Sequence, residues 1–178
     1  MLTNFAFIDA FTQKIYVEHF GSRAIKDCPR IRENLMRLSG LVINREIPYV
    51  GVRLKDSDIS AMDLECSMDT EIDEAVRDFS STDKQVILES PSLNVEEYVE
   101  GLVEHLNGLG IKTVFVYGVP YSAVAELATA LVGKIDKVWV VVDAIKNNEG
   151  TERELVKELS THGVKNINTR NLEKYLDM

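Results

Sequence analysis

The chain has 178 residues, 45% of them hydrophobic, and a formal net charge of −9, which suits one compact domain, residues 1–178, with its own apolar core. The negative charge argues against nucleic acid, whose binding proteins carry a basic surface, and against an anionic membrane surface. No apolar run approaches the roughly 20 residues of a membrane-spanning helix, and the first residues lack the basic region of a signal peptide, so we expect a cytoplasmic protein.

Six short apolar runs have the length of β-strands. The clearest are continuous blocks of Val, Ile and Phe, which is typical of parallel strands covered by helices on both faces. In chain order the runs are 5–11, 48–54, 85–90, 112–118, 137–144 and 164–169.

Amphipathic segments separate these strands. Residues 29–46 carry apolar side chains at helical spacing. A second helix is predicted from Asn94, which has the spacing of a capping box with Glu97, and a third over 151–163. The alternation predicts an α/β fold with three layers, a doubly wound parallel sheet between helices.

The least regular segment is 55–83, which is acidic. One helix is predicted within it, near 70–79, and the segment forms either a loop or a lid over one end of the sheet.

The stretch "YGVPYSAV" at 117–124 leaves a strand, turns through Gly118 and Pro120, and enters a helix predicted to start at Ser122 or Ala123. In doubly wound sheets, ligands bind beyond the carboxyl ends of the strands, where the strand order reverses. If the first strand, which ends at Asp9, neighbours the strand 112–118, Asp9 faces this junction.

Four stretches in this order and spacing carry a family resemblance: "FIDAF", "VILES", "GIKTVFVYGVPYSAVAELATAL" and "VWVVVDA". They resemble the isochorismatase-like hydrolases, which include nicotinamidases, over nearly the whole chain. The resemblance implies a six-stranded parallel sheet in the order 3-2-1-4-5-6. It also implies a homo-oligomer, a dimer or larger.

The resemblance also implies the positions of three catalytic residues. An Asp that acts as base matches Asp9. A Lys at the end of the third strand falls on Glu89, and a Cys nucleophile in the first turn of the helix after strand four falls on Val124. A valine side chain has no lone pair and cannot attack a substrate, and its apolar character fits a helix stripe with Leu127, Ala128 and Leu131.

Glu89 replaces a cation with an anion, and two arrangements stay open. Its carboxylate either approaches Asp9, sharing a proton or a cation with it, or turns outward into solvent. Asp56 and Asp58 follow the second strand, where some relatives hold a metal ion; the pair is a weak metal site or a solvated acidic loop. The two cysteines, Cys28 and Cys66, are expected to be free thiols.

Residues around the junction are candidates for lining a ligand site. Ser122 is either a displaced nucleophile or a helix N-cap, and the resemblance predicts that the Val119–Pro120 bond is cis. The candidate ligand-binding residues are Phe11, Tyr16, Val119, Pro120, Tyr121 and Ser122.

Two functions follow from these residues. The first is a protein without cysteine hydrolase chemistry, which binds a small ligand or associates with itself. The second is a hydrolase of amide-like or ether-like molecules, in which Asp9 and Glu89 activate water, directly or through a metal ion. No glycine-rich phosphate loop is present, and no cofactor is expected.

Overall fold

A computed structural model describes residues 4–13, 16, 31–55, 85–146 and 152–177. The strands are β1 (Phe5–Ala10), β2 (Tyr49–Leu54), β3 (Gln85–Ser90), β4 (Thr113–Gly118), β5 (Lys137–Ile145) and β6 (Lys165–Ile167). The helices are α2 (Arg32–Arg45), the short 3₁₀ helix η3 (Val95–Glu97), α5 (Val99–Gly108), α6 (Tyr121–Leu131), α7 (Glu152–Thr161) and α8 (Thr169–Leu176).

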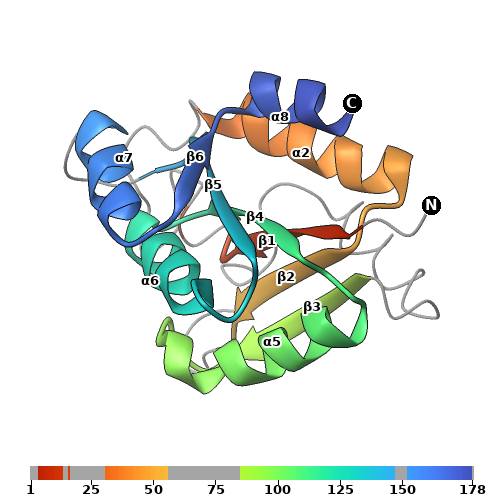
Figure 1. The fold of residues 1–178 in the computed structure, drawn as a ribbon. Helices are drawn as coiled ribbons and strands as arrows, with labels where there is room; N and C mark the ends of the chain where they lie inside the picture. The colour runs from red at the N-terminus through yellow and green to blue at the C-terminus, as the bar shows by residue number, and fades with distance from the viewer. Residues whose placement is uncertain (1–3, 14–15, 17–30, 56–84, 147–151, 178) are drawn as a thin grey trace.

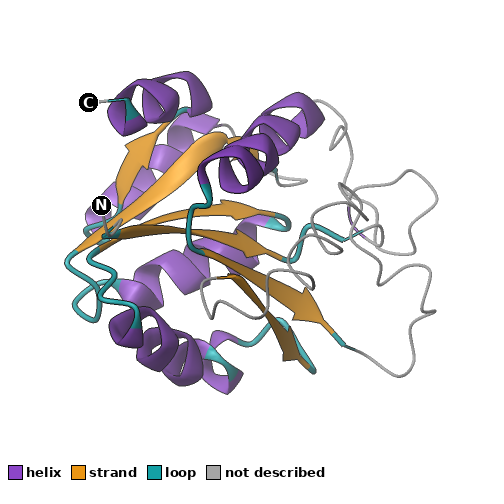
Figure 2. Cartoon of the chain, turned by 90° about the vertical axis from the view of Figure 1, so that its right-hand side faces the viewer, coloured by secondary structure: helices purple, strands orange, loops and turns teal. Residues whose placement is uncertain are grey.

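The six strands form one parallel sheet in the order β3-β2-β1-β4-β5-β6. This confirms the fold class and strand order predicted from the sequence, including the position of the first strand beside the fourth. Helices α2 and α8 lie on one face of the sheet, and α5 and α6 lie on the other (Figures 1 and 2). The carboxyl ends of the strands therefore meet at one edge, where the candidate site is expected.

The central strands are buried on both faces, which explains their continuous apolar sequences. β2 and β4 are buried at every position, and β1 at every position after Phe5. The buried polar residues Asp9 and Arg53 interrupt this apolar pattern, and both lie near the carboxyl ends of their strands. The buried charged groups of β1 and β2 therefore lie at the carboxyl ends of these strands.

The turn from β4 into α6 depends on a glycine. Gly118 has a positive φ of 124°, and a Cβ at this position would collide with the backbone carbonyl of Ala10, so only glycine fits. The Val119–Pro120 bond is cis, as the sequence predicts, and the Val119 N–H donates to the Ala10 carbonyl at 3.0 Å. These contacts hold the start of α6 against the end of β1.

Several element boundaries differ from those expected from the sequence. α6 begins at Tyr121, one residue before Ser122 and two before Ala123, the predicted starts, and Pro120 is its N-cap. Asn94 caps η3 rather than α5, accepting a hydrogen bond from the Glu96 N–H at 3.2 Å. The terminal helix α8 was not predicted, although Asn168 is a typical N-cap whose side chain accepts from the Asn171 N–H.

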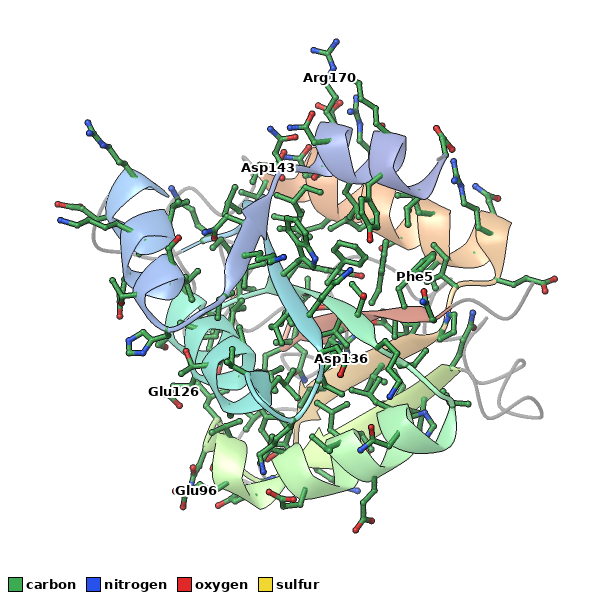
Figure 3. The ribbon with its side chains drawn as sticks, viewed as in Figure 1. Phe5, Glu96, Glu126, Asp136, Asp143 and Arg170 are labelled. Carbon is green, nitrogen blue, oxygen red and sulfur yellow. The ribbon has the colours of Figure 1, made fainter. Side chains whose placement is uncertain are left out.

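Asp143 explains how α8 is fixed to the sheet. The register of β5 on β4 shifts between Val116 and Gly118, and this irregularity contains Asp143. Its carboxylate accepts hydrogen bonds from the Thr169 N–H and hydroxyl, both at 2.8 Å, at the start of α8. Figure 3 labels Asp143 beside the first turn of α8. Its carbonyl accepts from the Asn34 side chain of α2 at 2.7 Å. This aspartate, which belongs to the quoted "VWVVVDA" stretch, therefore joins β5 to both helices of one face.

Candidate functional site

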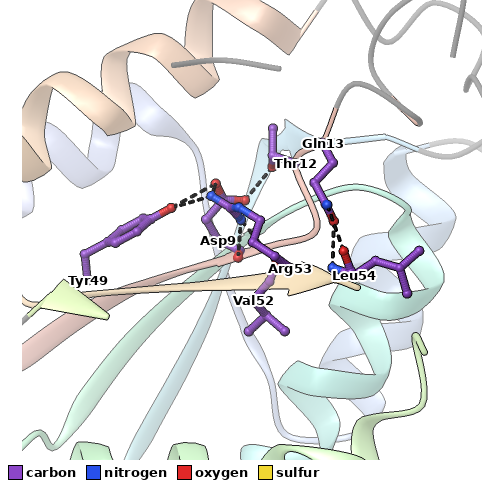
Figure 4. A network of polar contacts seen from close by, with 7 residues as sticks. All are labelled: Asp9, Thr12, Gln13, Tyr49, Val52, Arg53 and Leu54. Carbon is purple, nitrogen blue, oxygen red and sulfur yellow. Dashed lines mark hydrogen bonds and ion pairs between the residues drawn. The ribbon is translucent and has the colours of Figure 1, made fainter. Parts of the chain in front are cut away.

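Asp9 lies at the penultimate position of β1 and is 6% exposed. Its Oδ1 accepts a hydrogen bond from the Thr12 hydroxyl, and its Oδ2 accepts from the Tyr49 hydroxyl at 3.2 Å. The Arg53 guanidinium completes the group, with Nη2 at 3.2 Å from the same Oδ2 (Figure 4). We call Asp9, Thr12, Tyr49 and Arg53 the Asp9 cluster. The predicted catalytic base is thus part of a buried ion pair.

Arg53 makes hydrogen bonds through both terminal nitrogens. Nη2 donates to Asp9 and to the Tyr49 hydroxyl at 2.8 Å, and Nη1 donates to the carbonyls of Asp9 at 3.3 Å and Val52 at 3.2 Å. Two terminal nitrogens carry four N–H groups, so the four acceptors match the four donors. A buried charge is tolerated only with such partners, and the Asp9 carboxylate and the two terminal nitrogens of Arg53 have them among the described residues.

The spacing of β2 builds this arrangement. Tyr49, Gly51 and Arg53 project from one face of the strand because side chains alternate, and Asp9 is the register partner of Gly51. A Cβ on Gly51 would lie 3.0 Å from the Tyr49 hydroxyl and 3.1 Å from Arg53 Nη2. The absent side chain therefore leaves the room in which the two polar groups meet.

Sequence reasoning missed Tyr49 and Arg53. The run "YVGVR" was interpreted as one strand of a buried sheet, which is correct. The available signal was the pattern Tyr49, Gly51, Arg53. Two large polar side chains on one face of a strand, with a glycine between them, can contact each other over the glycine.

Glu89 is the penultimate residue of β3 and lies at the surface. Its Oε2 is 2.5 Å from Lys55 Nζ, and the two side chains are 57% and 68% exposed. Arg53 is its register partner on β2, yet Arg53 turns to Asp9. Of the two arrangements left open by the sequence, the outward one is observed, and Asp9 and Glu89 each have their own cation.

Val124 is fully buried in the first part of α6, together with Leu127, Ala128 and Leu131. This is the apolar stripe that the sequence predicts. The Val124 N–H donates to the Pro120 carbonyl at 3.3 Å. Position 124 thus belongs to the helix packing.

Asp9 and α6 are directed to different faces of the sheet. The rings of Phe7 and Phe115 are in contact, and Phe115 contacts Tyr175 of α8. Asp9 follows Phe7 by two residues and so projects to the α8 face, whereas α6 lies on the other face (Figure 1). Among the described residues, the Asp9 carboxylate accepts hydrogen bonds from Thr12, Tyr49 and Arg53, and not from residues of β3 or α6.

At the turn from β4 into α6, Tyr121 makes hydrogen bonds within the protein, whereas Ser122 is exposed. The Tyr121 N–H donates to the Lys146 carbonyl at 2.9 Å, and its hydroxyl donates to Glu158 of α7 at 2.9 Å. Burial, together with the acceptor carboxylate of Glu158, raises the pKa of Tyr121 to about 12. Ser122 is exposed, within the first turn of α6, and is not the N-cap. Tyr121 therefore ties α6 to α7.

Two further candidates, Phe11 and Tyr16, are buried, at 0% and 3% exposure. Phe11 has a positive φ of 59°, unusual for a bulky residue, and its N–H donates to the Val52 carbonyl at 2.8 Å. Its ring meets the edge of Tyr98 at 5.9 Å. Burial, and secondarily the charge of Glu126, raises the pKa of the Tyr98 hydroxyl. Phe11 and Tyr98 thus form an apolar contact beside the strand ends.

The remaining candidates lie outside the described residues. These are the weak metal candidates Asp56 and Asp58, both cysteines, Cys28 and Cys66, and all of the acidic segment 55–83 except Lys55. The part of the chain that the structure describes contains no group of three or more His, Cys, Asp or Glu residues able to hold a metal ion. It also contains no helix long and apolar enough to cross a membrane.

Comparison with known proteins shows similarity at the level of the fold. No family model matches the chain, and no curated protein does so significantly. An isochorismatase-like hydrolase from Alkaliphilus metalliredigens superimposes with a TM-score of 0.78 at 14% identity, covering 98% of this chain and 99% of that one. A pyrazinamidase of Pyrococcus horikoshii, solved with zinc, gives 0.75 at 17% identity over 93% and 99%.

An octameric hydrolase of unknown specificity from Escherichia coli gives a TM-score of 0.71 at 17% identity, covering 93% of this chain and 75% of that one. The chain therefore has the fold of the isochorismatase-like hydrolases, as the sequence resemblance predicts. At such low identity the similarity defines the fold, and the function must be argued from the residues.

Proposed function

We propose that this chain is a self-associating binding protein that keeps the isochorismatase-like fold without its cysteine-dependent hydrolysis. The observation that carries the proposal is Val124, whose apolar side chain is fully buried at the position where the resemblance expects the nucleophile. Loss of a covalent nucleophile removes most of the rate enhancement of such enzymes. A buried valine is also inaccessible to a substrate.

The contacts of Asp9 support the same conclusion. A general base needs a lone pair within reach of the proton that it takes. Both oxygens of Asp9 already accept hydrogen bonds from Thr12, Tyr49 and Arg53, and the Arg53 charge stabilises the carboxylate. Asp9 thus contributes to the packing of β1 against β2.

These observations favour self-association over the binding of a small ligand at Asp9. The Asp9 carboxylate already accepts hydrogen bonds from residues of the same chain. The octameric state of one protein with this fold supports a homo-oligomer. A small-molecule ligand at the junction is the second form of the proposal, for which exposed Ser122 is the available polar side chain.

The alternative function, a hydrolase that uses Asp9 and Glu89 with water or a metal ion, gains no support from the contacts of Glu89. Its carboxylate pairs with Lys55 at the surface. Paired carboxylates act together only when they share one proton, water or ion.

An amidase assay tests the catalytic part of the proposal. Purified protein is incubated with nicotinamide and pyrazinamide, and we expect no turnover above the uncatalysed rate. The double variant Val124→Cys with Glu89→Lys is also expected to stay inactive, because Asp9 remains paired with Arg53; Ala123→Cys, one residue away, is the matched control. Turnover by the wild type would contradict the proposal, and its loss in Cys28→Ser or Cys66→Ser would identify another thiol as the nucleophile.

Sedimentation equilibrium tests the self-association. We expect a dimer or a larger assembly whose mass does not depend on added nicotinamide. A monomer at all concentrations, together with saturable binding of a small amide, would replace self-association by the ligand-binding form of the proposal.

A further inference from the structure

The Asp9 cluster has the properties of a cation-binding site. Among the described residues, the guanidinium donates to four oxygen acceptors: the Asp9 carboxylate, the Tyr49 hydroxyl, and the carbonyls of Asp9 and Val52. The side chains of Asp9 and Arg53 are 8% and 7% exposed, so water contributes little to their solvation. An oxygen-lined, buried and negatively charged position binds a cation.

The acceptors are arranged for a planar cation with several donors. Each terminal nitrogen of Arg53 faces two acceptors, in the fork geometry that distinguishes guanidinium from the ammonium of lysine. Thr12 holds the other oxygen of the Asp9 carboxylate. The cluster is therefore specific in shape as well as in charge.

The space for this cation is built into the sheet. Gly51 has no side chain between Tyr49 and Arg53, so that Ile87, the Tyr49 hydroxyl and Arg53 Nη2 approach to within about 3 Å of where a Cβ would lie, and the register between β1 and β2 places Asp9 against Gly51. The strand register and the missing Cβ belong to the backbone and do not depend on the Arg53 side chain.

Arg53 is attached to the strand beside Asp9, which gives its guanidinium a high effective concentration at the site. A free cation cannot compete with such a tethered group at ordinary concentrations. The exposed Lys55–Glu89 pair shows the contrast, since its partners stay in contact with solvent.

We propose that the carboxyl ends of β1 and β2 form a binding site for a guanidinium or amidinium cation, which the chain fills with its own Arg53. Arg53 thereby keeps external cationic ligands away from Asp9. This inference goes beyond the function proposed above, which places no ligand at Asp9, and does not rest on it.

Thermal unfolding of Arg53→Ala, with and without guanidinium chloride, tests the inference. At about 10 mM, far below the molar concentrations that unfold proteins, guanidinium and methylguanidinium should raise the melting temperature of Arg53→Ala by about 2–5 °C. Equal concentrations of sodium chloride and of urea, the neutral planar analogue, should not. The wild type, whose site is filled, and Asp9→Asn with Arg53→Ala, which lacks the carboxylate, should show no specific rise.

The inference is overturned if guanidinium stabilises Arg53→Ala no more than sodium chloride or urea does, or if the double variant gains equally. If Arg53→Ala does not fold, the same comparison is made on the yield of refolded protein. Recovery with guanidinium alone supports the site, and equal recovery or none with all additives overturns it. Because the readout is stability, failure here leaves the amidase and sedimentation results of the proposed function unaffected.

Discussion

Two carboxylates at equivalent positions of the strands on either side of β2 have opposite environments. Asp9 and Glu89 are both penultimate residues of their strands, and both pair with a basic residue from the β2 segment. The Asp9–Arg53 pair is buried, and both terminal nitrogens of Arg53 donate hydrogen bonds, whereas the Glu89–Lys55 pair is exposed by more than half. Position in the sheet, central for β1 and at the edge for β3, accounts for the difference.

The two pairs show that burial determines how much stability is lost when one partner of an ion pair is removed. A buried pair costs much desolvation, so removal of one partner leaves an uncompensated charge. An exposed pair is screened by water and contributes little. The Tyr121–Glu158 hydrogen bond joins a buried tyrosine to an exposed glutamate, so we expect its contribution to stability to lie between those of the two ion pairs. One variant of each interaction tests this order.

Arg53→Met is expected to have the largest effect. The methionine is apolar and leaves the Asp9 carboxylate buried without its cation, which should lower the free energy of unfolding by about 3–5 kcal/mol. Urea denaturation measures the loss. Asp9→Asn with Arg53→Met is the control and should recover a large part of it, since the two effects are coupled. A loss below about 1 kcal/mol, the range of exposed pairs, would show that the pair is not buried in solution.

Tyr121→Phe should cost about 1 kcal/mol at neutral pH, because the hydrogen bond to Glu158 is lost. The pKa of Tyr121 is raised from 10 to about 12, so its contribution is complete below pH 10 and disappears as the pH rises to about 12. Urea denaturation of both proteins across this interval should show the difference in stability shrink toward zero. A difference that stays constant through pH 12 would exclude the raised pKa.

Lys55→Met should have the smallest effect, within about 0.5 kcal/mol, because the pair with Glu89 is exposed. Chemical denaturation in low and high salt checks it. It is the matched control for Arg53→Met, with the same substituted residue and a cation from the same segment. A loss as large as that of Arg53→Met would remove the distinction between the two carboxylates.

The fold was largely predictable because its signals are local. Short apolar runs predicted strands at all six positions, and the stripe of Val124, Leu127 and Leu131 was recognised in the sequence. Helix α8 was missed because it has only eight residues, and its attachment depends on Asp143, which is distant in sequence.

The site was predictable only in part. Asp9 was correctly placed at the end of the first strand, beside the β4 strand, but its partners were not identified. Arg53 lies 44 positions away in the chain, and a contact of this kind depends on strand register, which no local pattern specifies. For Glu89, the sequence left two directions open, and the edge position of β3 decided between them.

The sequence by itself determined the α/β fold, the strand order implied by the family resemblance, and the absence of a nucleophilic side chain at position 124. Only the tertiary structure decided which cation meets which carboxylate, and hence that Asp9 is enclosed with Arg53 while Glu89 pairs with Lys55 at the surface. The physical reason is that hydrophobic periodicity acts over a few residues, whereas the pairing of buried charges depends on the space left between strands, here above Gly51.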